Sequence, residues 1–244
     1  MKKQLLPYII LYFFYNISSA QDILVNYRNY AIEAGKISDT TVIKMLLPYK
    51  DSLQKQMKQV LGFSLQGMFK KQPESGLGNF IADCMKQMAE KKFEQKVDAA
   101  IVSYGGLRHF VPKGEITLGT LVDIMPFDNK IVLQELSGKL LQELLNITAE
   151  KGGWPLSGIE MHIQHKKAVQ VRVNHSPLDE NKMYRIACTD YLANGGDGCR
   201  MLQGILKQSA GYLFLDALKE YCLLQTEQYR PIDGRIENRV VYDN

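Results

Sequence analysis

The decapeptide TDYLANGGDG, Thr189 to Gly198, follows directly on the hydrophobic, β-branched run MYRIAC at residues 183–188. The run predicts a strand. The glycines after it predict a tight turn, because glycine tolerates backbone conformations that other residues avoid. Such a turn lets neighbouring groups approach a ligand closely, and it places one aromatic ring, Tyr191, and one carboxylate, Asp197, on the same rim.

Two further loops carry side chains of the same kind. SYGGLR, Ser103 to Arg108, follows a strand predicted over residues 98–103, and MPFDN, Met125 to Asn129, supplies a second aromatic ring. Rings can stack on a base, an arginine can fork onto phosphate oxygens, and a carboxylate can accept hydrogen bonds from ribose hydroxyls. The three loops together therefore predict a nucleotide site.

These pieces and their order resemble the C-terminal domain of the 5′-nucleotidase / UDP-sugar hydrolase family. The motifs that carry the resemblance are LGNFIAD (77–83), YGGLR (104–108), GEIT (114–117), MPFDN (125–129), ELSG (135–138) and YLANGGDG (191–198). The match in order and spacing runs from about Thr40 to the C-terminus. It covers nearly all of the chain beyond the first segment.

The resemblance implies a role for each candidate residue. Phe127 and Tyr191 would sandwich the base, Arg108 would contact phosphate or sugar oxygens, and Asp197 would accept from the ribose hydroxyls. The remaining candidates implied for the substrate site are Asn129 at the base edge, Lys71 as a second cation, and Ser103, Gly105, Gly106, Gly195 and Gly196 in the turns. The chain departs from the family pattern at Ser103, where the family has Asn, and at Tyr104, where it has Gly.

Each candidate also has a purely structural interpretation. The two rings can be ordinary core residues, and Arg108 can be a surface residue in an ion pair. Asp197 can bond its own backbone in the turn, as Asp in such loops often does. Asn129 can be a simple turn residue, and Asp190, which flanks the same turn, is interpreted as structural.

The family's metal-binding motifs are missing from this sequence. Full-length members begin with a metallophosphatase domain whose ligands lie in motifs such as D-x-H, GNH-E and GH-x-H, and none of these occurs here. The four histidines are His109, His162, His165 and His175. His162 and His165 are three apart on a predicted strand and would face opposite sides. We therefore expect no catalytic residue and no metal site in this chain, with divalent metals only in a partner metallophosphatase domain.

The N-terminus predicts export. Lys2 and Lys3 precede an apolar stretch from Leu5 to Ile17, and SSA at 18–20 resembles a cleavage site. We expect a signal peptide over 1–20, a lead-in segment and linker helix over 21–62, and a 5′-nucleotidase C-terminal-like domain over 63–244. An uncleaved anchor helix is the alternative, although the stretch is short for a membrane span. Cleavage would leave no stable span and place the chain in the periplasm or cell envelope.

Composition excludes little else. Of 244 residues, 45% are hydrophobic, and the formal net charge of +4 falls to +2 without Lys2 and Lys3. No block of Lys and Arg suggests a nucleic-acid partner. The four cysteines, Cys84, Cys188, Cys199 and Cys222, form no CxxC pair. They favour buried free thiols over a zinc or redox motif, and a disulfide among them stays open.

Periodicity predicts helices interleaved with adjacent strands, an α+β fold with a mixed sheet packed against helices. Five helices are expected. The first begins at Ser38 or Asp39 and runs to about Gly62, bent or broken at Pro48. The others cover 77–94, run from Thr117 to Ile124, begin at Ser137, and cover 213–226. The expected strands are 98–103, 130–136, 158–164, 168–174, 183–189 and 235–242.

Three functions are compatible with the sequence. The first is an exported nucleotide-recognition domain that grips base and sugar while a separate metallophosphatase chain hydrolyses the phosphoester in nucleotide catabolism. The second is a non-catalytic nucleotide- or nucleoside-binding module. The third is a scaffold whose pocket no longer binds a ligand. Whether the chain acts as part of an enzyme depends on that partner.

Overall fold

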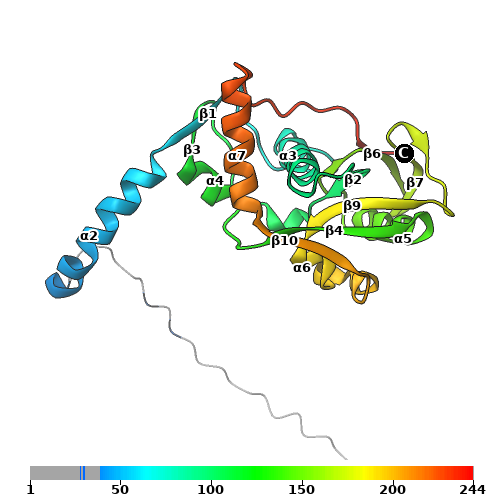
Figure 1. Cartoon of the computed structure of the whole chain (residues 1–244), viewed down its shortest axis with the longest axis horizontal. Helices are drawn as coiled ribbons and strands as arrows, with labels where there is room; N and C mark the ends of the chain where they lie inside the picture. The colour runs from blue at the N-terminus through cyan, green and yellow to red at the C-terminus, as the bar shows by residue number, and fades with distance from the viewer. Residues whose placement is uncertain (1–27, 29, 31–38, 244) are drawn as a thin grey trace, which may run out of the picture. The chain divides into compact units, whose positions relative to one another are not determined.

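The structure, a computed structural model, describes residues 28, 30 and 39–243 (Figure 1). The chain divides into residues 1–45 and residues 46–244. The expected signal peptide falls outside the described residues. Within the described part, no helix combines the length and apolar character needed to cross a membrane.

Helix α2 runs from Thr40 to Met57 and is continuous through Pro48. A bend or a break was expected at Pro48, and the helix is not broken there. No residue of this helix is buried. Asp39 caps the helix by accepting from the Thr41 and Val42 amides at 2.8 and 3.3 Å. The helix ends five residues before Gly62, because residues 60–64 form a strand instead.

A five-stranded mixed sheet forms the centre of residues 46–244 and confirms the predicted α+β class. Its strand order is β10 (Lys207–Leu213), β4 (Lys130–Ser137), β9 (Met183–Thr189), β2 (Ala99–Ile101) and β5 (Leu156–Ser157). β2 and β9 are parallel, and the other neighbours are antiparallel. Strand β10 was not predicted, because it is mostly exposed and polar.

The two faces of this sheet belong to two different hydrophobic cores, because successive side chains of a strand point to opposite faces. On β4, Ile131 and Leu133 join a core with helices α3 (Gly76–Phe93) and α7 (Phe214–Glu227). Val132 and Leu136 join a second core with helix α5 (Gly138–Glu150). In Figure 1, α3 and α7 are drawn above β4 and β9.

The helix starts predicted at Thr117 and Ser137 are confirmed: Thr117 caps α4 (Leu118–Ile124) and Ser137 caps α5, each accepting a backbone N–H from the first turn. Ser75, which the sequence analysis did not single out, caps α3 in the same way. Helix α4 follows β3 (Gly114–Thr117), which pairs with β1 (Val60–Ser64) in a separate antiparallel sheet. These local signals place α4 directly before the MPFDN loop.

A four-stranded sheet covers the second core, in the order β11 (Val240–Tyr242), β6 (Ile159–Gln164), β7 (Lys167–Val173) and β8 (Ser176–Pro177). The strand predicted over 235–242 is shorter than expected. Arg239, just before it, forks onto both oxygens of Asp83, which fixes the preceding chain as an irregular segment. His165 lies in the turn after β6 at φ 49°, so it is not a strand residue.

The four cysteines are free and buried, which agrees with the favoured prediction. Burial raises the pKa of Cys188 and of Cys222 to about 12, and that of Cys199 to about 11. Burial also holds the pKa of Cys84 well above its usual value. These thiols therefore stay protonated at neutral pH and are weak nucleophiles.

Candidate functional site

The first loop of the site turns sharply after β2. Ser103 is buried, and its carbonyl accepts the Gly106 amide at 3.0 Å to close a 3-10 turn over Tyr104–Gly106. The Arg108 amide then donates to the Ile124 carbonyl at 3.1 Å. This bond ties the first loop to the end of α4, where the second loop begins.

The second loop presents Phe127 and Asn129. Phe127 is half-buried against the core that contains α3 and α7, so one side of its ring is supported by protein. The Arg108 guanidinium lies 5.2 Å from the centre of the Phe127 ring. The carbonyl of Asn129 accepts the Phe214 amide at 2.9 Å, which anchors the end of the loop to α7.

The third loop begins where β9 turns into the short helix α6 (Asp190–Ala193), capped by Thr189. Gly195 has φ 88° and Asp197 has φ 52°. Both lie in the left-handed region, so the TDYLANGGDG stretch does form the tight turn that its glycines predict. Tyr191 stands at the start of this turn and is 48% exposed.

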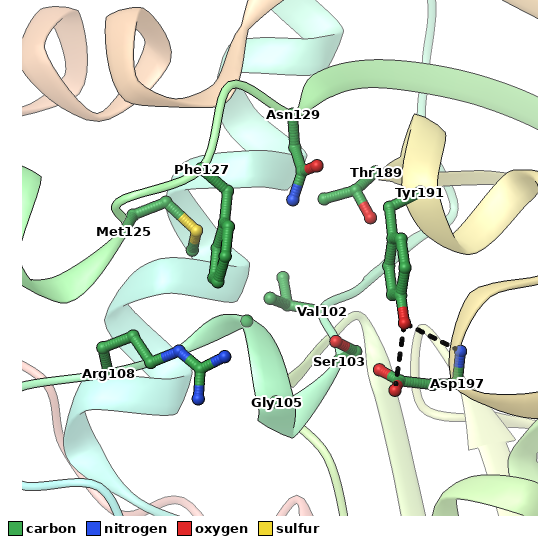
Figure 2. Close-up of a pocket in the computed structure, with 11 residues that line it drawn as sticks. Val102, Ser103, Gly105, Arg108, Met125, Phe127, Asn129, Thr189, Tyr191 and Asp197 are labelled. Carbon is green, nitrogen blue, oxygen red and sulfur yellow. Dashed lines mark hydrogen bonds between the residues drawn. The ribbon is translucent and has the colours of Figure 1, made fainter.

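The three loops enclose one cavity of about 260 Å³. Its lining residues are Val102, Ser103, Gly105, Gly106, Arg108, Met125, Phe127, Asn129, Thr189, Tyr191 and Asp197. Figure 2 shows the rings of Phe127 and Tyr191 on opposite sides of this space, with Arg108 near one end and Asp197 near the other. Eight of the eleven residues predicted for the substrate site line the cavity together.

Gly195 and Gly196, two of the remaining candidates, do not line the cavity but contact side chains of the third loop and its neighbours. A side chain at Gly196 would place its Cβ 2.4 Å from a ring carbon of Tyr191, so only glycine lets the ring lie where it does. Gly195 meets the side chain of Gln203 in the same way, at 2.8 Å. Both glycines therefore shape the third loop rather than the cavity wall.

Lys71, the last candidate, is exposed and does not line the cavity. Its neighbour Lys70 turns inward instead. The Lys70 ammonium donates to the Leu107 carbonyl at 2.9 Å and lies 3.8 Å from the centre of the Tyr104 ring. Burial, and then the nearby Arg108 charge, lower the pKa of Lys70. Sequence spacing alone could not decide between the two adjacent lysines.

Three lining residues, Val102, Met125 and Thr189, were not named as site residues. Met125 and Thr189 are the first residues of MPFDN and TDYLANGGDG, and Val102 directly precedes SYGGLR. Their place in or beside these stretches was the available signal.

The histidines are dispersed. His162 pairs with Asp243 at 2.6 Å, His175 pairs with Glu160 at 2.7 Å, and His109 packs against Phe110 with ring centres 4.6 Å apart. Among residues 39–243 with the two isolated described positions, no group of three or more His, Cys, Asp or Glu could hold a metal ion. The chemical groups at the cavity are the rings of Phe127 and Tyr191, the guanidinium of Arg108 and the carboxylate of Asp197.

Comparisons with known proteins agree with this arrangement. A family model described as "5'-nucleotidase, C-terminal domain" matches residues 56–204. The trifunctional nucleotide phosphoesterase protein YfkN of Bacillus subtilis is 30% identical in an alignment 183 residues long that covers 67% of this chain and 12% of YfkN. A 5′-nucleotidase of Vibrio vulnificus is 28% identical over 213 residues, covering 83% of this chain and 37% of the relative.

A solved structure shows the same fold. The 5′-nucleotidase precursor of Thermus thermophilus superposes with a TM-score of 0.73 at 24% identity, over 84% of this chain and 44% of that one. The chain thus spans less than half the length of each of these three proteins. Because the family model covers more than half of the sequence, the chain belongs to the 5′-nucleotidase C-terminal domain family.

Proposed function

We propose that this chain is a nucleotide-recognition domain, which binds the base and sugar of a nucleotide while a separate metallophosphatase domain or chain hydrolyses the phosphoester. The observation that carries the proposal is the pair of rings, Phe127 and Tyr191, on opposite sides of one cavity (Figure 2). A flat base between two rings gains stacking of roughly 1–3 kcal/mol per contact, with tolerance for base identity.

The charged residues fit the two ends of a nucleotide. Arg108 is exposed, and a planar guanidinium fork binds phosphate oxygens in pairs. Asp197 lies at the Tyr191 end, where its carboxylate can accept from two ribose hydroxyls. Asn129 adds an amide beside the ring of Phe127, suited to a base edge.

The size of the cavity favours partial enclosure of the ligand. Its volume of about 260 Å³ is below the roughly 300–1,000 Å³ usual for complete ligand pockets. A base and part of a sugar would fill it, and the phosphate would extend past Arg108 toward solvent. That arrangement suits a ligand whose reacting end is handled by another protein surface.

A hydrolytic partner is supported by two observations. The relatives named 5′-nucleotidase are more than twice as long as the part that this chain matches. In addition, helix α2 buries none of its side chains among the described residues, although Leu46, Leu47 and Leu53 on it are large and apolar. Exposed apolar side chains on one helix are typical of a surface that another protein covers. In this proposal the divalent metals and the attacking water belong to the partner, and the chain acts after export to the periplasm or cell envelope.

Titration calorimetry of the purified chain with adenosine, AMP and UDP-glucose tests the proposal. Binding of at least one of these ligands with a 1:1 stoichiometry is the expected result. Absence of binding at millimolar ligand, by a chain shown to be folded, would reject it. Because both rings, Arg108 and Asp197 come from this one chain, the site also suits a non-catalytic nucleotide- or nucleoside-binding module. Stimulation of a metallophosphatase chain's AMP hydrolysis separates the two.

A further inference from the structure

The carboxylate of Asp190 joins two walls of the cavity without lining it. One oxygen, Oδ1, accepts the amide of Lys130 at 3.0 Å and the amide of Tyr191 at 3.0 Å. Lys130 follows Asn129 on the second loop, whereas Tyr191 belongs to the third. Lys130 and Asp190 are 60 positions apart in the chain, so the bond between them is a tertiary link.

The hydrogen bond from the Lys130 amide takes the place of the next backbone hydrogen bond between β4 and β9. The β4–β9 ladder ends at the pair Ile131 and Thr189. Beyond it the chain turns into α6, and the Asp190 carbonyl is used by the Asn194 amide at 3.0 Å. The Asp190 side chain therefore extends the ladder by one position, at the point where β9 no longer offers a carbonyl to β4.

The position of the second loop depends on the hydrogen bond between the Lys130 amide and the Asp190 carboxylate. On one side of the peptide group that joins residues 129 and 130, the Asn129 carbonyl accepts the Phe214 amide at 2.9 Å. On the other side, the Lys130 amide donates to Asp190. Loss of the carboxylate would leave this peptide group held from one side only, and it would also release the first amide of the Tyr191 segment.

We propose that Asp190 is a positioning residue, which sets the separation between the Phe127–Asn129 wall and the Tyr191 wall so that a nucleobase fits between the rings. The inference rests on the proposed nucleotide function and goes further, because it assigns the width of the base slot to a residue that does not touch the ligand. In this proposal Asp190 is more than a structural residue, because its hydrogen bonds determine how well the ligand binds.

The test uses Asp190→Ala, Asp190→Asn and Asp190→Glu in the full chain, with adenosine as the ligand in titration calorimetry. Asp190→Ala should weaken adenosine binding at least tenfold. Asp190→Asn should stay within threefold of the wild type, because the amide oxygen can accept the same two N–H groups. Asp190→Glu keeps the charge but displaces the oxygen by one methylene, so it should lose at least fivefold even if the alanine variant does not fold.

Two controls separate positioning from general stability. Asp98 accepts the Arg185 amide of the same strand β9 at 2.8 Å and lies outside the cavity lining. Asp98→Ala should lower the melting temperature without changing adenosine affinity. In a Tyr191→Ala background, Asp190→Ala should cost less than threefold, because the wall that it positions is already gone.

The outcomes are distinct. If the wild type binds adenosine and both Asp190→Ala and Asp190→Glu bind equally well, the positioning role is rejected and the proposed function stands. Full additivity with Tyr191→Ala also rejects it. If the folded wild type binds no nucleoside or nucleotide, the proposed function fails, and the positioning role fails with it.

Discussion

Tyr191 and Asp197 hold each other across the third loop. The Tyr191 hydroxyl donates to Asp197 Oδ1 at 3.4 Å and accepts the Asp197 amide at 3.3 Å (Figure 2). The ring is thereby fixed at its outer end, while Gly196 leaves room beside it. A residue that is 48% exposed is thus ordered by its own loop rather than by the core.

Replacement of Tyr191 by Ala or by Phe should separate stacking from this anchoring. Tyr191→Ala should weaken AMP binding by roughly 1–3 kcal/mol, because one stacking face is lost. Tyr191→Phe keeps the face and should retain most of the affinity. Calorimetric titration of both variants with AMP is the measurement. Equal affinities for the alanine variant and the wild type would show that the ring does not stack on the ligand.

Phe127 has a second role in packing, so a different substitution is informative there. Phe127→Leu keeps an apolar side chain against the core but removes the flat face. We expect the melting temperature to change little while AMP affinity falls by roughly 1–3 kcal/mol. Thermal unfolding and titration on the same preparation check this. A large loss of stability with unchanged affinity per folded molecule would instead identify Phe127 as a core residue.

Arg108 should distinguish ligands that carry a phosphate from ligands that do not. Arg108→Ala should reduce AMP affinity more than adenosine affinity, and Arg108→Glu should reduce it further. Arg108→Lys should restore only part of the loss, because a point charge lacks the paired geometry of a guanidinium. The observable is the ratio of AMP to adenosine dissociation constants across the series. A ratio that is the same in all four proteins removes Arg108 from the phosphate end.

The isolated chain should not release phosphate from AMP, with or without added Mn²⁺ or Zn²⁺. The expectation follows from the absent metal-ligand motifs of the family in this sequence. A colorimetric phosphate assay on chain freed of contaminating phosphatase is sufficient. Sustained metal-dependent release that a Tyr191→Ala variant loses would place a catalytic centre in this chain and contradict the two-component proposal.

Alkaline pH should destabilise the fold through its buried thiols. In the unfolded chain these thiols ionise near their ordinary pKa of 9.0, whereas in the folded chain burial raises the pKa of Cys188 and Cys222 to about 12. Above pH 9 the unfolded state therefore binds fewer protons, and the free energy of unfolding falls as pH rises. Urea denaturation at pH 7.5 and pH 10 should show the decrease, and Cys222→Ala should make it smaller. Identical unfolding free energies at both pH values would contradict the assignment.

Features with a local cause could be predicted from the sequence. Thr117 and Ser137 cap their helices because a side-chain oxygen satisfies amides two or three residues away, and that relationship lies within one turn. The glycine-rich turn around Asp197 is local in the same sense. For these reasons α4, α5 and the third loop of the site begin where the sequence predicts them.

Features with a non-local cause could not be predicted from the sequence. Lys70, not Lys71, turns inward onto the Leu107 carbonyl and the Tyr104 ring, two residues after Met68, which is held by a bridge to the distant Val111. Strand β10 exists because β4 offers it a free edge, while its own residues are mostly polar. No pattern along the chain shows that the Asp190 carboxylate reaches Lys130, so its link between two loops emerged only from the structure.

The left-handed backbone at Asp197 has a thermodynamic consequence for any ligand. A residue other than glycine held at φ 52° carries strain of order 1–3 kcal/mol, which the rest of the fold must offset. The free-energy cost of this strain is offset during folding, before any ligand binds. In the proposed complex the sugar would meet a backbone turn that is already formed, so little further backbone entropy would be lost on binding.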